Sequence, residues 1–366
     1  MHTYILEGNS SSKTYGYKVQ HQTLSRSRLL LHRALGLFGQ KSRSNAHQSR
    51  LSRPENPKAT PIFLLGFARS GTTTFQRILA DSLDYNFAFE PFGFNHANYP
   101  PKEFQSISAF FRNAPDLSSM DRYLIDGGAA AAIDMIRSES TRGKYTALLG
   151  DYINWLIEHY GRNVVIKEVR LLFNLPTLVS IFKNPEIPAL FVLLRFDPIN
   201  TLYTFYRLGG LVEGRDDFGH RVDEFYSYHR QISALNQSFE FPVCRCSNKW
   251  EKLLVSIKHY QNVMEHFSSR FSANCVLVNF ETASEGIALI SKRLGYPARS
   301  DKGKVTLKPA RYKMDSVFLD TAHERISKEV LVATGVSLPT ERQIPVSTKQ
   351  RFQFRITQLQ NKLLEL

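Results

Sequence analysis

Cysteine is scarce in this chain, and long hydrophobic runs are missing. The 366 residues include only Cys244, Cys246 and Cys275, an odd number whose spacing fits neither a zinc site nor a disulfide framework. We therefore expect free thiols in a reducing compartment. No segment reaches the roughly 18 consecutive apolar residues that a membrane-spanning helix needs, and no hydrophobic signal-peptide core lies near the start. The sequence thus predicts a soluble, cytoplasmic protein.

Acidic residues are scarce at the start of the chain. Residues 1–60 hold ten lysines and arginines against Glu7 and Glu55, which gives this stretch +8 of the formal net charge of +14. We expect residues 1–57 to form a solvated basic arm; a membrane-surface contact and an organelle-targeting segment are the alternatives. The rest of the chain is only mildly basic and contains no known nucleic-acid-binding module, so we expect no nucleic-acid partner.

Phenylalanine, in contrast, is abundant. The chain has 26 Phe, and apolar residues make up 42% of it, which is enough for a large packed core. We expect one catalytic domain over residues 58–335. A tail follows over residues 336–366, and it is predicted to contain a helix from Thr348.

The strongest local signal is a strand, a turn and a helix in succession. Pro61–Phe67 is an unbroken apolar run, typical of a strand buried on both faces of a parallel sheet. From Thr72 onward the apolar residues recur with helical spacing. The turn between them, Gly66–Thr73, has the spacing of a phosphate-binding loop, but Thr72 replaces the usual lysine and Arg69 supplies a positive charge inside the loop.

This turn is suited to binding an anion. Its glycines let consecutive N–H groups and the start of the following helix point at one anionic group. The loop suits a phosphate joined to a second anionic group. It suits magnesium-dependent triphosphate hydrolysis less well, because the lysine that reaches the outer phosphates is missing. The predicted anion-binding residues are Arg69, Ser70, Gly71, Thr72, Thr73 and Thr74.

Further strand and helix patterns alternate along the chain. Strands are predicted at Asn163–Val169, Ala189–Phe196 and Asn274–Phe280, each followed by a helix, and a short aromatic strand ends at Glu90. This alternation predicts a P-loop-like, three-layer α/β/α fold with a central parallel sheet.

Two segments are expected to shape the ligand site. Residues 102–160 are predicted to form a helical insertion over the sheet, and residues 209–247 to form a lid. Ligands of such sheets bind at the carboxyl ends of the strands. Arg69, Lys167 and Arg195 all lie at or just after such ends and are expected to converge there.

Five short motifs at these strand ends resemble those of one enzyme family. In chain order they are Arg69–Thr73, Phe89–Phe92, Val165–Leu171, Leu193–Pro198 and Val278–Glu281. Together they resemble the sulfotransferase superfamily, which uses 3′-phosphoadenosine 5′-phosphosulfate (PAPS), and the second and third are most similar to the carbohydrate branch. The resemblance implies transfer of a sulfuryl group from PAPS to a hydroxyl or amine of a carbohydrate or small-molecule acceptor, with no metal.

The resemblance also implies roles in catalysis. Arg69 would stabilise the charge that develops on the leaving phosphate. Val169 stands where cytosolic sulfotransferases carry their catalytic histidine, so Glu90 becomes the leading candidate for the base. It follows Arg69 by 21 residues, a spacing similar to that in protein-tyrosine sulfotransferases. Glu90 could instead be a helix cap or a structural ion-pair partner; His96 and Glu168 are weaker candidates for the base.

Other charged residues at the strand ends have predicted roles as well. Lys167 would reach the sulfate or the bridging oxygen, and a lysine within an apolar strand needs an anionic partner. Arg170 points the other way along an extended strand and is a secondary site. Asp197 and Glu281 are expected to satisfy backbone or basic partners.

The resemblance assigns the nucleoside end of the cofactor to later residues. Arg195 and Thr204 would bind the 3′-phosphate, and Lys308 and Arg311 are candidates for the adenine region. The chain departs from the family pattern at Phe196, which occupies the usual arginine position if the following Asp-Pro keeps its register. A bulge or an early strand end would bring Arg195 back to the phosphate.

Two other classes of function remain as alternatives. A P-loop kinase or nucleotide hydrolase uses the same strand and turn, but Thr72 in the lysine position and the lack of a clear magnesium-binding aspartate on a neighbouring strand end argue against it. A non-catalytic nucleotide-binding pseudoenzyme, acting through its basic arm, is the second alternative.

Overall fold

A computed structural model of the chain describes residues 60–91, 139–169, 171–183, 188–212, 222–296 and 314–339. Several predictions lie outside these residues. They concern the basic arm 1–57, most of the insertion before residue 139, the helix from Thr348, and the side chains of His96, Arg170, Lys308 and Arg311.

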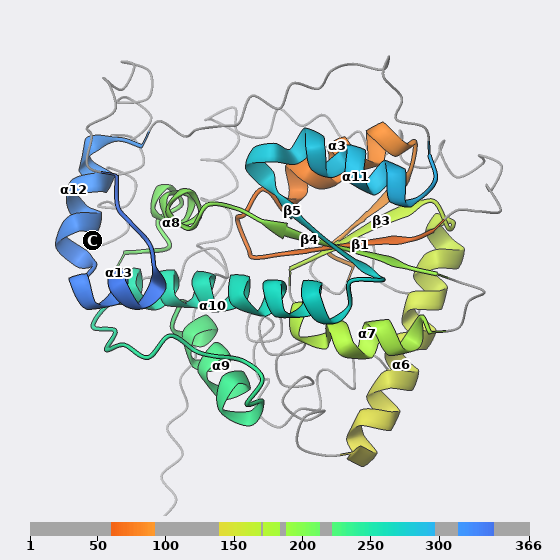
Figure 1. Cartoon of the computed structure of the whole chain (residues 1–366), viewed down its shortest axis with the longest axis horizontal. Coiled ribbons are helices and arrows are strands. Elements are labelled where there is room, and N and C mark those ends of the chain that lie inside the picture. The colour runs from red at the N-terminus through yellow and green to blue at the C-terminus, as the bar shows by residue number, and fades with distance from the viewer. Residues whose placement is uncertain are drawn as a thin grey trace, which may run out of the picture. The chain divides into compact units, whose positions relative to one another are not determined.

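A five-stranded sheet forms the centre of the described part. Its strands pair in the order β2-β3-β1-β4-β5 (Figure 1), and every pair is parallel. The predicted α/β fold with a central parallel sheet is therefore confirmed. The strands are β1 (Ile62–Gly66), β2 (Asn86–Phe89), β3 (Val164–Glu168), β4 (Leu190–Arg195) and β5 (Cys275–Asn279).

Helices cover both faces of the sheet, as the three-layer prediction required. One face packs against α3 (Thr72–Leu83) and α11 (Ala283–Arg293). The other packs against α6 (Glu139–Tyr160), α7 (Leu175–Ile181) and α10 (Lys249–Arg270) (Figure 1). The remaining helices are α8 (Pro198–Arg207), α9 (Val222–Leu235), α12 (Ser316–Arg325) and α13 (Lys328–Thr334), with short 3₁₀ turns at Leu172–Asn174 and Phe280–Thr282.

Side-chain alternation along the strands divides the core into two layers. On β4, Phe191 and Leu193 belong to the cluster on the α10 side, whereas Val192 and Leu194 belong to the cluster on the α3 side. Successive residues of a strand point to opposite faces of the sheet. The same rule decides on which side each charged residue at a strand end lies.

The segment predicted as a lid contains a packed helix. Within residues 209–247, α9 lies beside α10 (Figure 1) and buries Val222, His229 and Ile232.

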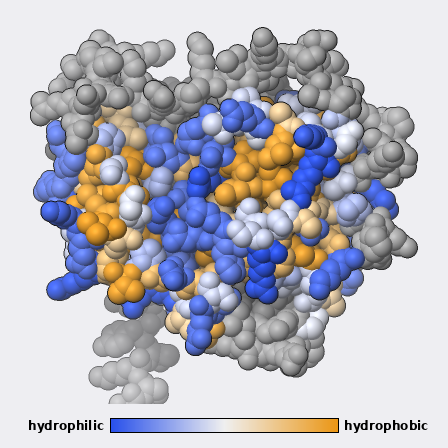
Figure 2. Space-filling view, in the orientation of Figure 1, coloured by the Kyte–Doolittle hydropathy of each residue, from blue (hydrophilic) through white to orange (hydrophobic). Residues whose placement is uncertain are grey.

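On the face shown in Figure 2, hydrophilic and hydrophobic side chains are interspersed. None of the described helices is both long enough and apolar enough to cross a lipid bilayer.

Candidate active site

The turn between β1 and α3 is held by its own hydrogen bonds. Both Oγ and N of Ser70 donate to the carbonyl oxygen of Phe67, at 2.6 and 3.2 Å. The first backbone bond of α3 runs from Phe75 N to Gly71 O at 3.0 Å, so the preceding N–H groups point out of the helix start. No side chain caps the N-terminal end of α3, all of which the structure describes, and the first turn of this helix contains no acidic residue. The turn therefore presents an uncapped, partly positive helix end.

Both glycines of the turn are required by close packing. A Cβ atom at Gly66 would collide with the methyl group of Thr72, and one at Gly71 would lie 2.7 Å from the ring of Phe280. Gly71 also has a φ of 79°, which glycine adopts at little cost. The spacing that predicted a phosphate-binding loop thus reflects real steric limits on the backbone.

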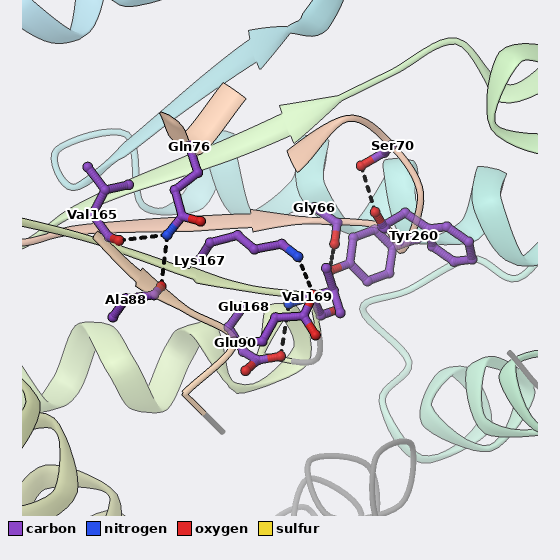
Figure 3. A network of polar contacts seen from close by, with 11 residues as sticks. Gly66, Ser70, Gln76, Ala88, Glu90, Val165, Lys167, Glu168, Val169 and Tyr260 are labelled. Carbon is purple, nitrogen blue, oxygen red and sulfur yellow. Dashed lines mark hydrogen bonds and ion pairs between the residues drawn. The ribbon is translucent and has the colours of Figure 1, made fainter. Parts of the chain in front are cut away.

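Glu90 and Lys167 form an ion pair at the adjacent strand ends. Lys167 Nζ donates to Glu90 Oε1 (Figure 3), and the two side chains are only 3% and 15% exposed. The ammonium also lies 4.4 Å from the centre of the Phe89 ring. The anionic partner expected for a lysine in an apolar strand is therefore Glu90. The ion-pair alternative for Glu90 is real, and its role as a base stays a prediction.

Arg69 joins this pair. Burial lowers the pKa of the Arg69 guanidinium, and the negative charge of Glu90 offsets part of that shift. Glu90 thus interacts with two cations from different strands: Arg69 follows β1, and Lys167 lies near the end of β3. The structure therefore brings Arg69 and Lys167, two of the three residues predicted to converge, to the candidate base Glu90.

Backbone strain is concentrated at the same place. Among the described residues, the non-glycine residues with positive φ are Arg69 (63°), Glu90 (43°) and Asp84 (59°). Asp84 is explained by its place at the end of α3. Arg69 and Glu90 instead follow the two strands that flank β3, and Glu90 N donates to Lys167 O of β3 at 2.9 Å. Strained residues of this kind cluster at active sites, where the surroundings impose their conformation.

Two residues that support the site were missed in the sequence. Buried Gln76 on α3 donates from Nε2 to Ala88 O on β2 (2.8 Å) and to Val165 O on β3 (2.9 Å). The signal available was a polar residue within the apolar face of a helix. Figure 3 shows how this amide ties the strands that carry Glu90 and Lys167.

Tyr260 on α10 is the second missed residue. Its hydroxyl lies 3.2 Å from Gly66 O and 3.1 Å from Val169 O (Figure 3). It therefore ties the end of β1 to the end of β3 from beneath the loop. No local pattern could reveal this contact, because Gly66 is 194 positions away along the chain.

The end of β4 is arranged differently. Arg195 Nε donates to Asn279 Oδ1 at 2.8 Å, and Nη1 forms an ion pair with Glu265 on α10. Alternation places Arg195 on the α10 side of the sheet, and Lys167 on the α3 side. The ring of Phe196 lies against Phe280 with centroids 5.1 Å apart. The structure therefore does not bring Arg195 to the Glu90–Lys167 pair.

The start of α8 follows the pattern expected for its acidic residues. Asp197 accepts a hydrogen bond from Asn200 N at 2.8 Å, and Glu281 accepts one from Asp197 N at 2.9 Å. The prediction that both carboxylates satisfy backbone partners is confirmed. Thr204 Oγ1 donates to Asn200 O of its own helix at 2.9 Å, which leaves the oxygen lone pairs for another donor.

The weaker candidate Glu168 lies elsewhere. It is fully buried, and Val169 N donates to its Oε1 at 3.0 Å. Alternation puts it on the face opposite to Lys167, where its charge contributes to the raised pKa of Tyr152, a shift caused mainly by burial. Across the described residues, no group of three or more metal-binding side chains occurs.

Comparison with known proteins gives similarities in structure only. No protein-family model matches the chain, and no curated protein matches its sequence. The sulfotransferase domain of the Synechococcus PCC 7002 olefin synthase is 12% identical, with a TM-score of 0.35, over 79% of this chain and 99% of that one. A sulfotransferase from Alicyclobacillus acidocaldarius is 15% identical, with a TM-score of 0.34, over 78% and 98%.

A third similar structure is the sulfotransferase domain from the curacin biosynthetic pathway. It is 15% identical, with a TM-score of 0.34, over 84% of this chain and 99% of that one. All three structures bear the name of the family that the motifs resemble. At such low identities and TM-scores they carry no argument about activity, so a function has to be argued from the residues of the site.

Proposed function

We propose that this protein is a sulfotransferase that moves a sulfuryl group from PAPS to a hydroxyl or amine of a carbohydrate or small-molecule acceptor. The observation that carries the proposal is the convergence of Arg69, Glu90 and Lys167 beside the uncapped start of α3. An anion-binding helix end, two cations and one carboxylate are the groups that sulfuryl transfer needs.

The loop would bind the phosphosulfate. The free N–H groups at the start of α3 suit the 5′-phosphate, because fixed donors and the helix dipole both favour an anion. In the reaction the bond from sulfur to the phosphate oxygen breaks, and a bond from sulfur to the acceptor forms. Negative charge then grows on the phosphate, and Arg69 would stabilise it as a fixed donor.

Glu90 would accept the proton of the acceptor. In the structure its carboxylate is paired with Lys167. An arriving sulfate group offers Lys167 a second anion, so the ammonium can move toward the sulfate while Glu90 turns to the acceptor. General base catalysis requires such a carboxylate within hydrogen-bond reach of the acceptor.

The remaining contacts to the cofactor stay predictions. Thr204, Lys308 and Arg311 are proposed for the 3′-phosphate and the adenine. Arg195 is proposed with a condition, because its guanidinium would have to exchange Glu265 for the phosphate. No step of the proposed reaction requires a metal ion.

Ligand binding and transfer test the proposal together. Adenosine 3′,5′-bisphosphate should stabilise the full chain by about 2.7 kcal/mol at a concentration near one hundred times its Kd. ATP with magnesium at the same concentration should stabilise it less. Donor with labelled sulfate should then label at least one member of a panel of sugar, phenol and amine acceptors.

The alternatives predict different results. Stronger stabilisation by ATP with magnesium, together with phosphate release or transfer, would identify a P-loop kinase or hydrolase. Binding of the bisphosphate with no transfer to any acceptor in the panel would support a non-catalytic nucleotide-binding protein.

A further inference from the structure

Two of the three cysteines lie together, and the proposed reaction uses neither of them. Cys244 and Cys246 belong to the segment that joins α9 to α10, and their sulfur atoms are 3.9 Å apart. Both are free thiols, as is Cys275 on β5.

Exposure along this segment alternates from residue to residue. Val243 is 94% exposed and Arg245 is exposed, whereas Cys244 and Cys246 are half-buried against the core. A period of two is typical of an extended backbone, in which residues two positions apart share one face. The two thiols therefore lie side by side because of the local backbone.

The neighbouring residues anchor this arrangement. Arg245 N donates to Glu329 Oε1 on α13 at 3.2 Å. Ser247 donates to Glu251 Oε2 on α10 from both N and Oγ, at 2.6 and 2.8 Å. Cys246 and Tyr226 on α9 also share a hydrogen bond. Contacts to three helices thus hold the two sulfur atoms at this separation.

We propose that Cys244 and Cys246 form a reversible dithiol–disulfide couple that exchanges with low-molecular-weight disulfides such as glutathione disulfide. The thiolate of one cysteine attacks the oxidant and releases one thiol. The second cysteine then displaces the other thiol from the mixed disulfide. Two S–H bonds are lost, one S–S bond forms, and the oxidant is reduced to two thiols. This property does not depend on the sulfotransferase activity.

Geometry indicates that the disulfide would be easy to reduce. In an extended chain the Cα atoms of residues two apart are about 6.4–6.8 Å from each other, at the upper end of the range of about 4.4–6.8 Å found in disulfides. Closing the S–S bond to about 2.0 Å would bend a segment that is anchored on both sides. Strained disulfides are the readily reduced ones.

Exchange should be slow at neutral pH and faster in alkali. Burial, followed by the neighbouring Cys246, raises the pKa of Cys244 to about 12. Burial also raises the pKa of Cys246, and hydrogen bonds from Tyr226 and Cys244 offset part of that shift. The thiolate is the attacking form, and a raised pKa means that less thiolate is present at a given pH. The rate of exchange should therefore still rise with pH where an ordinary thiol is already fully ionised. The charged or titratable groups facing the pair are Tyr226, Glu251, Lys252 and Glu329.

Peptide mapping of the full-length protein tests the couple. After incubation with glutathione disulfide, the protein should lose two titratable thiols and become lighter by the mass of two hydrogen atoms. Trypsin cuts after Arg245, between the two cysteines, so the disulfide should join two peptides that separate on reduction. Excess reduced glutathione should restore both thiols.

Serine variants provide the matched controls. Cys275→Ser should behave like the natural protein, and Cys244→Ser should lose the linked peptides. Loss of no thiol, a stable glutathione adduct on either cysteine, or a link to Cys275 would each overturn the proposal. The mapping of the natural protein decides the question even where a serine variant fails to fold.

Discussion

The carboxyl ends of β1, β2 and β3 differ from the carboxyl end of β4, although all four strands are parallel and these ends lie along the same side of one sheet. At the first three, Arg69, Glu90 and Lys167 meet, and two of them have strained backbones. At β4, Arg195 is paired with Glu265 on α10 and with Asn279.

The difference arises from which face of the sheet each side chain occupies. Lys167 and Arg195 are each a basic residue near the end of an apolar strand, so the sequence pattern predicts the same kind of site for both. Lys167 lies level with Val192 across β1, so Arg195 is three positions further along its strand. An odd offset puts the two side chains on opposite faces of the sheet, because neighbouring residues of a strand point to opposite faces. The cation on the α3 side pairs with Glu90, and the cation on the α10 side pairs with Glu265 of α10.

The largest effect is expected at Arg69. Arg69→Ala should lower transfer about a thousandfold, since removing one donor to the developing charge costs about 10²–10³ in rate. Alanine retains the Cβ atom and hence the backbone strain, so the melting temperature should change little. Arg77→Ala, an exposed arginine on α3, is the control. Retained turnover in the Arg69 variant would remove this residue from the mechanism.

A smaller loss is expected at Glu90. Glu90→Gln keeps the shape but not the basicity of the side chain, so kcat should fall about a hundredfold while the Kd for adenosine 3′,5′-bisphosphate stays within a few-fold. Glu265→Gln, at the other ion pair, is the matched control and should leave kcat unchanged. Equal losses of kcat in both variants would show that the two ion pairs do not differ in their contribution to the reaction.

Tyr260→Phe should have a modest effect on both stability and rate. The variant leaves Gly66 O and Val169 O without the hydroxyl, which should cost about 1 kcal/mol in the free energy of unfolding and lower kcat several-fold through a looser loop. Tyr296→Phe is the control, because its hydroxyl lies 3.2 Å from that of Tyr85 at the other end of β2. A changed Kd with an unchanged kcat would argue that Tyr260 does not position the reacting groups.

The smallest effect is expected at Arg195. Its ion pair with Glu265 is partly exposed, at 35% and 50%, and such pairs contribute about 0–1 kcal/mol. Little is therefore gained by keeping the pair and little is lost by breaking it. With Arg195 still paired to Glu265 in the complex, Arg195→Gln should weaken binding of adenosine 3′,5′-bisphosphate by less than about threefold, as measured by titration calorimetry. A loss of tenfold or more would show that Arg195 leaves Glu265 to bind the 3′-phosphate.

Much of the fold could be predicted because the signals were local. The apolar run before Gly66 and the helical spacing after Thr72 predicted β1 and α3 within one residue of their observed starts. The other strands were also correct, since buried parallel strands read as continuous apolar runs. The partner of Lys167 could be predicted only as an anion, because its identity depends on the pairing of β2 with β3.

The missed residues depend on contacts between distant parts of the chain. Gln76 and Tyr260 act on backbone carbonyls, which leave no mark in the sequence at the receiving positions. The pairing of Arg195 with Glu265 was missed for a related reason, since it joins β4 to a helix seventy positions later. Sequence patterns locate strand ends well, but they do not reveal which of the neighbouring charges will meet.

The order of the strands bears on how the protein is made. β3 lies between β1 and β2 in the sheet, although it follows both in the chain by more than seventy residues. During synthesis Arg69 and Glu90 therefore leave the ribosome well before the strand that brings them together. A nascent chain that ends before residue 164 contains the loop and the carboxylate but no assembled site. Pairing over such a separation is slow, so we expect affinity for the phosphosulfate to develop late in refolding, after most helices have formed.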